Sequence, residues 1–191
     1  FPFFNPEEFF MIIKTILAAT AAIALTACAS NMGAPAMPFS QASLPAAVQV
    51  PAGHKVAMET VGVGQITYEC RAKKDMAGHE WVFVGPDAKL MSRSGKQVGK
   101  YYGPPATWES NDGSKLTATQ LAVAPAAAGS IPLQLVKANP AMGMGAMQGV
   151  TYIQRVATQG GVAPASVCGA MTAGQKQVVK YTADYIFWRA A

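Results

Sequence analysis

The sequence predicts an all-β fold, either an antiparallel β-sandwich or a closed β-barrel of about seven to eight strands, in a single domain with one disulfide. Three observations carry this prediction. From Val48 onward, apolar and polar residues alternate with a period of two, and no sustained helical stripe is present. Glycine and proline separate the alternating runs. Two cysteines, Cys70 and Cys168, lie within the alternating region.

The first clear strand covers residues 65–70, and its inward face is expected to carry Ile66, Tyr68 and Cys70. A second run, residues 80–84, is expected to end at Gly85-Pro86, because proline has no N–H to donate to a neighbouring strand.

A hairpin is predicted at residues 111–114. The Asp112-Gly113 pair readily adopts the positive φ of a tight turn, and residues 115–123 form the strand that follows it.

Three later runs complete the pattern. We expect one shared face for Ile131, Leu133 and Leu135, and another for Val150, Tyr152 and Val156. The longest run covers residues 178–188. One side of it carries Val179, Tyr181, Ala183, Tyr185 and Phe187, and the other carries Lys180, Thr182 and Asp184. Its length places it inside the sheet.

Composition excludes several other classes of protein. The chain has 191 residues, of which 51% are hydrophobic and 13% are charged, which is not typical of a disordered or collagen-like protein. At about 150 residues per domain, the chain holds one globular domain with appendages. Its basic residues are scattered, and aromatic residues are not interleaved with them. No nucleic-acid partner is therefore expected.

The N-terminal region predicts export. Residues 1–10 lack an initiator Met and contain two acids, so we interpret them as an upstream extension that is not part of the protein. Residues 11–27 have a short basic start, an apolar stretch and a small-residue end, which is typical of a lipoprotein signal peptide. Cleavage would leave Cys28 as the lipidated N-terminus. An ordinary secretory signal is the alternative.

This interpretation predicts a location and a partner. Residues 28–47, rich in Ala, Pro, Ser and Gly, are expected to form a flexible tether, and residues 48–191 the β-rich exported domain. A lipidated Cys28 would anchor the domain to the membrane at the periplasmic face of a bacterial cell envelope. A soluble periplasmic or secreted protein is the alternative. In an oxidising compartment, Cys70 and Cys168 are expected to form a disulfide.

A series of short motifs runs through the predicted domain. They are Tyr68-Glu69-Cys70, Trp81-Val82-Phe83, Gly103-Pro104 with Trp108-Glu109, Tyr152-Ile153-Gln154-Arg155-Val156, residues 158–164, and residues 181–187. In this order they resemble the secreted bacterial and fungal domain-of-unknown-function family 3455, over about residues 50–188. The resemblance implies an exported, β-rich domain and assigns no catalytic residue. Members often carry a His just before Gly-Pro-Thr-Trp, where this chain has Tyr101-Tyr102.

The leading functional hypothesis is a non-enzymatic binding or structural module. A polar and aromatic ligand surface is expected at Tyr101, Tyr102, Trp108, Glu109 and Asp112. Ring faces stack on sugars and carboxylates accept hydroxyl donors, so the ligand would be an envelope polymer or a small molecule. The alternative for Trp108 is an ordinary core position.

The second hypothesis is a periplasmic copper(I) site, and otherwise no cofactor is expected. Met142, Met144 and Met147 place three thioethers close together in the sequence, and thioethers select Cu(I). His79, or His54, would add a nitrogen ligand. In the competing interpretation, Met147 packs in the core and the other two fill gaps or remain exposed.

An envelope hydrolase is the third hypothesis. The chain has no G-x-S-x-G nucleophile motif, and His54 and His79 are its only histidines. No catalytic residue is therefore assigned, and enzymatic activity stays undecided.

Overall fold

The computed structural model describes residues 38–191. The predicted extension, signal peptide, lipidation site Cys28 and most of the tether lie outside the described residues. The chain divides into the units Phe1–Pro38 and Phe39–Ala191, and the second holds all the secondary structure described here. No helix in this part of the chain is long and apolar enough to cross a membrane.

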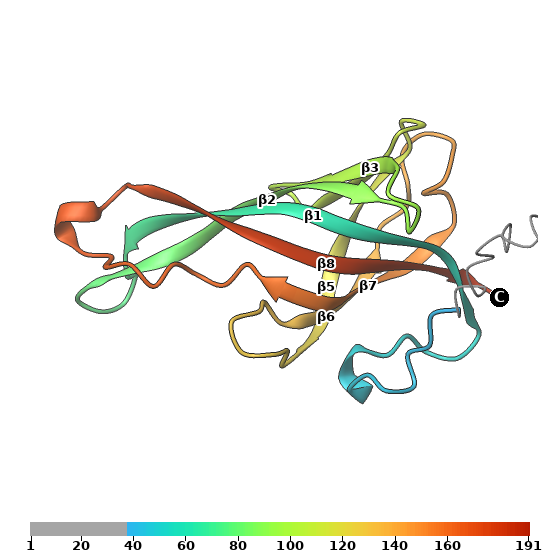
Figure 1. Ribbon diagram of the computed structural model, residues 1–191, viewed down its shortest axis with the longest axis horizontal. Helices are drawn as coiled ribbons and strands as arrows, with labels where there is room; N and C mark the ends of the chain where they lie inside the picture. Colours follow the sequence, from blue (N-terminus) through green and yellow to red (C-terminus); the bar gives the residue numbers. More distant parts are fainter. Residues whose placement is uncertain (1–37) are drawn as a thin grey trace, which may run out of the picture. The chain divides into compact units, whose positions relative to one another are not determined.

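Eight antiparallel strands close into a barrel in simple sequence order, with β8 paired to β1 (Figure 1). The all-β prediction is confirmed, and of its two architectures the structure has the barrel. The strands are β1 (His54–Ala72), β2 (His79–Met91), β3 (Gln97–Tyr102), β4 (Thr107–Ser110), β5 (Lys115–Ala124), β6 (Leu133–Ala138), β7 (Val150–Gly160) and β8 (Lys176–Ala190). Two short 3-10 helices, η1 (Ala46–Val48) and η2 (Ala170–Thr172), complete the elements.

Strands β1, β2 and β8 run on beyond the other strands at one end of the barrel (Figure 1). Residues 67–72 of β1 pair with the first half of β2 and with the start of β8, whereas β3 joins β2 only from Asp87 onward. We call this the extended end. The β7–β8 loop is fastened to it by the Cys70–Cys168 disulfide, whose Cα atoms are 5.5 Å apart, which confirms the predicted pairing.

Strand β2 corrects one prediction. It continues through Gly85-Pro86, and Pro86 pairs with Ile66 of β1. Because β3 begins its pairing one residue later, at Asp87, Pro86 has no strand on its other side that would need a donor. The β1–β2 register also shifts between Thr67 and Tyr68, which is a β-bulge next to Gly85-Pro86.

At two positions, neighbouring strands approach so closely that only glycine fits between them. A Cβ added to Gly64 would collide with the Asp87 carbonyl of β2, and one added to Gly99 would collide with the Glu109 carbonyl of β4. The missing side chains let neighbouring backbones approach closely where the barrel bends. The predicted hairpin turn between β4 and β5 is present, with Gly113 at φ 86°.

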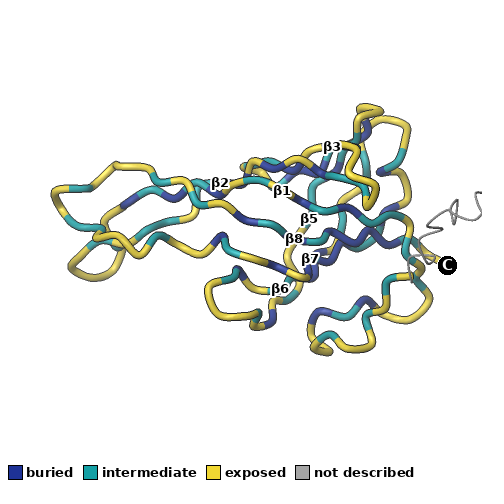
Figure 2. The backbone as a smooth tube through the Cα atoms, viewed as in Figure 1, coloured by how far each residue is buried: buried dark blue, intermediate teal, exposed yellow. Residues whose placement is uncertain are grey.

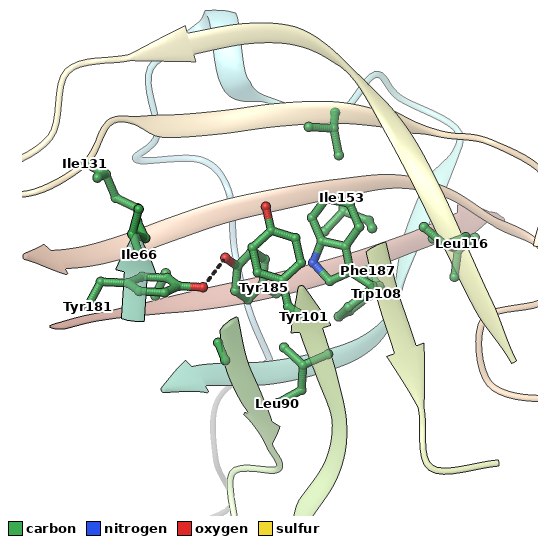
Figure 3. Packing of buried hydrophobic residues seen from close by; sticks show 14 of the residues in the cluster. Ile66, Leu90, Tyr101, Trp108, Leu116, Ile131, Ile153, Tyr181, Tyr185 and Phe187 are labelled. Atoms are coloured by element: carbon green, nitrogen blue, oxygen red, sulfur yellow. Dashed lines mark hydrogen bonds between the residues drawn. The ribbon is translucent and has the colours of Figure 1, made fainter. Parts of the chain in front are cut away.

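The inside of the barrel is filled by one hydrophobic cluster, called here the inner cluster (Figure 3). Its largest members come from facing strands, and Tyr101, Trp108 and Tyr185 pack ring against ring. The predicted alternation of β8 is confirmed, because Tyr181, Ala183, Tyr185 and Phe187 all belong to this cluster.

A second cluster, the outer cluster, lies on the outer face of β5 to β8. It is covered by residues 39–50, whose Val48 and Val50 are buried and whose Phe39 and Leu44 pack against it. The packed unit therefore begins at Phe39, within the last part of the segment predicted as tether. Figure 2 shows buried positions within this covering segment.

Two predictions of residues that share one face are wrong, because each set divides between the inner and the outer cluster. Leu135 belongs to it, with Leu133 packed against it, whereas Ile131, just before β6, joins the inner cluster. Val150 likewise points inward, while Tyr152 and Val156 contact the outer cluster. A register shift between Val150 and Tyr152 exchanges the two faces, and a one-residue shift moves every following side chain to the opposite side.

Gln154 is the polar centre of the outer cluster. Its side chain is fully buried, and its Nε2 donates to the Val48 carbonyl and to Gln41 Oε1. Its Oε1 accepts from the indole N–H of Trp188 at 2.9 Å. Gln41 in turn exchanges two hydrogen bonds with the backbone of Val50. This network fixes the covering segment on the barrel.

Replacing Gln154 by Ala is expected to loosen that segment. The variant leaves the Trp188 indole and the Val48 carbonyl buried without a partner, at a cost of about 1–3 kcal/mol for each such group. Chemical denaturation should show a loss of this size, and hydrogen exchange should rise in residues 39–50. The exposed Gln159→Ala change in the same strand is the control. Equal stability of both variants would contradict the network.

Candidate functional site

The five residues of the predicted ligand surface occupy three separate places. Trp108 and Tyr101 are 2% and 6% exposed, and their stacked rings, 4.5 Å apart, belong to the inner cluster. The surface therefore does not form as predicted, because the β3–β4 register pairs Tyr101 with Trp108 and turns both inward. The core interpretation of Trp108 is the one that the structure supports.

Tyr102 and Glu109 lie on the outer face as a hydrogen-bonded pair. The Tyr102 hydroxyl donates to Glu109 Oε2 at 2.7 Å, and Lys100 Nζ lies 3.3 Å from Glu109 Oε1. The hydrogen bond from Tyr102 lowers the pKa of Glu109, and the same bond raises the pKa of Tyr102. These groups satisfy one another across the strands.

Asp112 organises the turns at the opposite end from the extension. Its carboxylate accepts from the Ser114 hydroxyl, the Ser114 N–H and the Ala146 N–H. The Ser114 hydroxyl, followed by the Ala146 and Ser114 amides, lowers the pKa of Asp112 to about 2. Asp112 therefore ties the β4–β5 turn to the β6–β7 loop.

The predicted copper ligands are not brought together. Met147 is 1% exposed in the inner cluster, whereas Met142 and Met144 are 53% and 84% exposed. His79 begins β2 opposite Ala72 at the extended end, while Met142 bridges to Lys115 at the start of β5. Residues 38–191 contain no cluster of three His, Cys, Asp or Glu side chains placed to hold a metal. Of the predicted copper ligands, Met142 and Met144 are the two thioethers that remain exposed.

Alanine substitutions of Met147 and Met144 distinguish a core methionine from an exposed one. Met147→Ala should lower the free energy of unfolding by about 2–5 kcal/mol, because it opens a cavity in the barrel. Met144→Ala should change it by less than about 0.5 kcal/mol, as expected for an exposed position. Urea denaturation of the two variants measures both values. A neutral Met147→Ala would mean that this side chain is not a core residue.

A different set of side chains marks the candidate site. Cross-strand partners in an antiparallel sheet point to the same face. Arg155 of β7 pairs with Tyr185 of β8, an inner-cluster residue, and Gln134 of β6 pairs with Arg155. Val123 of β5 pairs with Gln134, and Gln120 pairs with the inner residue Val136. All four therefore face into the barrel. We call Gln120, Val123, Gln134 and Arg155 the inner wall.

The inner wall reverses the usual polarity of a small barrel, whose interior is filled by apolar side chains. Val123 is 47% exposed and Gln120 is exposed, while Gln134 and Arg155 are partly exposed. Solvent therefore reaches the inner face of β5, β6 and β7 toward the extended end. At the same level, their outer face is apolar, with Ala124, Leu135 and Val156 buried in the outer cluster.

Two contacts hold the inner wall in place. Nε and Nη2 of Arg155 donate to the Pro132 carbonyl at 3.2 and 3.0 Å. Gln134 Nε2 donates to Gln120 Oε1. The strand also bulges just past Arg155, where Ala157 has φ 48° and the Thr158 hydroxyl donates to the Ile131 carbonyl. Both β7 contacts run to residues 131–132, just before β6.

Four phenol groups lie within the electrostatic reach of Arg155. Burial raises the pKa values of Tyr68, Tyr101, Tyr181 and Tyr185, and the positive charge of Arg155 lowers them in opposition. The hydroxyls of Tyr181 and Tyr185 are hydrogen-bonded to each other (Figure 3). The Tyr68 hydroxyl donates to the Gly161 carbonyl at 2.8 Å. The phenols are therefore neutral at physiological pH, so they add no negative charge that would pair with Arg155.

A hollow of about 380 Å³ lies at the tip of the extension, between β1 and β2. Its walls carry both signs of charge, from Arg71, Lys73 and Lys74 and from Asp75 and Glu80. Arg71 is already paired with Glu69 at 2.9 Å. Because its walls carry charges of both signs, this hollow has no single charge preference for a ligand.

The inner wall could not be predicted from the sequence. Arg155 stands out in the sequence as a charge within an apolar strand, which is equally typical of a solvated face. The face it occupies depends on the bulges of β5 and β7, which the alternation does not reveal.

Comparison with known proteins yields one family. A family model described as "Protein of unknown function (DUF3455)" matches residues 51–189, which include every strand of the inner wall and both disulfide cysteines. No curated protein and no solved structure matches the chain.

Proposed function

The chain belongs to the DUF3455 family of proteins of unknown function, and we propose that it is a non-enzymatic binding module of the bacterial cell envelope with its ligand site at the inner wall. The observation that carries the proposal is the reversed polarity of β5, β6 and β7. At this level of the barrel, Ala124, Leu135 and Val156 are buried on the outer face, and Gln120, Gln134 and Arg155 are presented on the inner face, toward solvent.

Elsewhere the inner face of the barrel is filled by apolar side chains, whereas at the inner wall it carries polar groups that are exposed or partly exposed. Polar groups on a rigid sheet are also well suited to ligand binding, because their positions are fixed before the ligand arrives. The inner wall is therefore best explained as a recognition surface.

The envelope location is supported by the lipoprotein-type signal that ends before Cys28. Acyl chains on Cys28 would hold the module at the membrane. Residues 29–38 separate this cysteine from the packed unit, and a segment of that length spans at most about 35 Å. Mass spectrometry of the mature protein should find an acylated Cys28, and a free N-terminus near Met37 would refute the anchor.

Binding at the inner wall is tested by NMR on the full chain. Isotope-labelled protein is titrated with three soluble probes: glucose, 4-hydroxybenzoate and tyramine, which represent a polyol, an acid and an amine. At least one should shift the backbone amides of Gln134 and Arg155 more than those of residues 73–78 at the hairpin tip. Shifts confined to the tip, or none with any probe, would refute the proposed site.

A further inference from the structure

We propose that the ligand of the inner wall is a small organic acid and that Arg155 binds its carboxylate. This proposal rests on the proposed function, because it names the ligand class of the same site. It starts from the charge of Arg155. The ion pairs of residues 38–191 use Arg71, Arg93 and Lys100, and none of them uses Arg155. Because the guanidinium of Arg155 has no acid within ion-pair distance among these residues, its charge is available to an anionic ligand.

The guanidinium is also oriented. Its Nε and Nη2 both donate to the Pro132 carbonyl, so this contact occupies the side edge of the planar guanidinium, which carries Nε. The end edge, formed by Nη1 and the second hydrogen of Nη2, makes no hydrogen bond within the described chain. Two parallel N–H groups on one edge match the two oxygens of a carboxylate. The Pro132 carbonyl therefore holds Arg155 ready for a bidentate contact.

The surroundings favour a ligand with an apolar or aromatic body. Val123 is 47% exposed on the same inner face, one strand beyond Gln134. On the extended end, Tyr68 and the exposed Phe83 of β2 pack edge to face, with ring centroids 6.1 Å apart. Because the four nearby phenols are neutral, they do not compete with the ligand for the charge of Arg155. The Gln120–Gln134 amide pair adds neutral hydrogen-bonding groups.

The test compares two probes of nearly the same shape. The full chain is titrated at pH 7 with 4-hydroxybenzoate and with its neutral amide, 4-hydroxybenzamide, and the amide shifts of Arg155 and Gln134 are fitted for affinity. We expect the acid to bind about 10-fold or more tightly than the amide, as a charge-assisted pair implies.

Variants assign that preference to Arg155. Arg155→Gln should weaken acid binding about 10-fold or more, and Arg155→Lys should lie between it and the wild type, because lysine keeps the charge but loses the fork. The control, Lys180→Gln, removes one charge from the outer face of β8 and should leave binding unchanged. A dispersed amide spectrum of each variant confirms that it is folded. If Arg155→Gln does not fold, Arg155→Lys still tests whether the two N–H groups of the guanidinium are needed.

The outcomes separate this inference from the proposed function. Equal binding of acid and amide at the inner wall would overturn the carboxylate assignment while leaving a binding site there. Acid binding that is unchanged in Arg155→Lys would overturn the bidentate contact, and unchanged binding in Arg155→Gln would overturn the role of Arg155 altogether. Failure of glucose, tyramine and both benzoate-type probes to shift any inner-wall amide would overturn both proposals.

Discussion

Trp108→Ala is expected to lower the free energy of unfolding by about 3–5 kcal/mol, the range found when large aromatic side chains are removed from cores. Trp108 is 2% exposed, stacks on Tyr101 and meets the edge of Tyr185. Truncation would leave a cavity at the centre of the inner cluster. Because domains of this kind are stable by only about 5–15 kcal/mol, the loss is a large fraction of the total.

Guanidinium denaturation measures this loss, and Tyr102→Ala provides the control. Tyr102 is the neighbour of Tyr101 in β3, but its ring lies on the outer face and its hydroxyl makes one bond, to Glu109. Its removal should cost less than about 1.5 kcal/mol. If the two variants lost similar stability, Trp108 could not be the central core residue. Trp108 Nε1 has no partner among the described residues, so Trp108→Phe should recover part of the loss.

Removing the disulfide is the second change with a large expected effect. Cys70 and Cys168 close a loop with a sequence separation of 98, and losing a native disulfide typically costs about 2–5 kcal/mol. The Cys70→Ala/Cys168→Ala variant should therefore unfold at a markedly lower urea concentration. Reductant should shift the wild-type midpoint in the same direction and leave the double variant unaffected.

The loss should also be localised. Beyond the disulfide, backbone hydrogen bonds hold the two ends of the β7–β8 loop, and its middle is held by the Trp81 indole donating to the Ser166 carbonyl and by the Ser166–Gln177 side-chain bond. Both contacts lie on the exposed extension. Hydrogen exchange in residues 161–175 should therefore rise more than in β4 or β5. An unchanged midpoint on reduction would show that the bridge contributes nothing to stability.

The sequence predicted the barrel well where alternation is regular. In β8, the inward set from Tyr181 to Phe187 follows directly from the period of two. The disulfide was equally predictable, because two cysteines in the domain of an exported chain usually pair with each other. The ordered motifs also pointed to the family that the comparison shows.

Prediction failed where the register shifts. In β5 the shift lies between Gln120 and Ala122, and in β7 shifts flank residues 152–156. Each shift moves side chains to the other face, so Arg155 faces inward while Gln154 and Val156 face the outer cluster. The second apolar face was a further obstacle, because β6 is buried on both sides at Leu135 and Val136. Long-range packing of residues 39–50, which local sequence does not encode, decides these positions.

The register of β6, β7 and β8 is the foundation of the proposed site, and NMR distance contacts test it most directly. We expect backbone NOE contacts between Arg155 and Tyr185 and between Gln134 and Arg155. Contacts that instead pair Gln154 with Tyr185 would slip β7 by one residue. Arg155 would then face the outer cluster, and the inner wall, with the function proposed for it, would not exist.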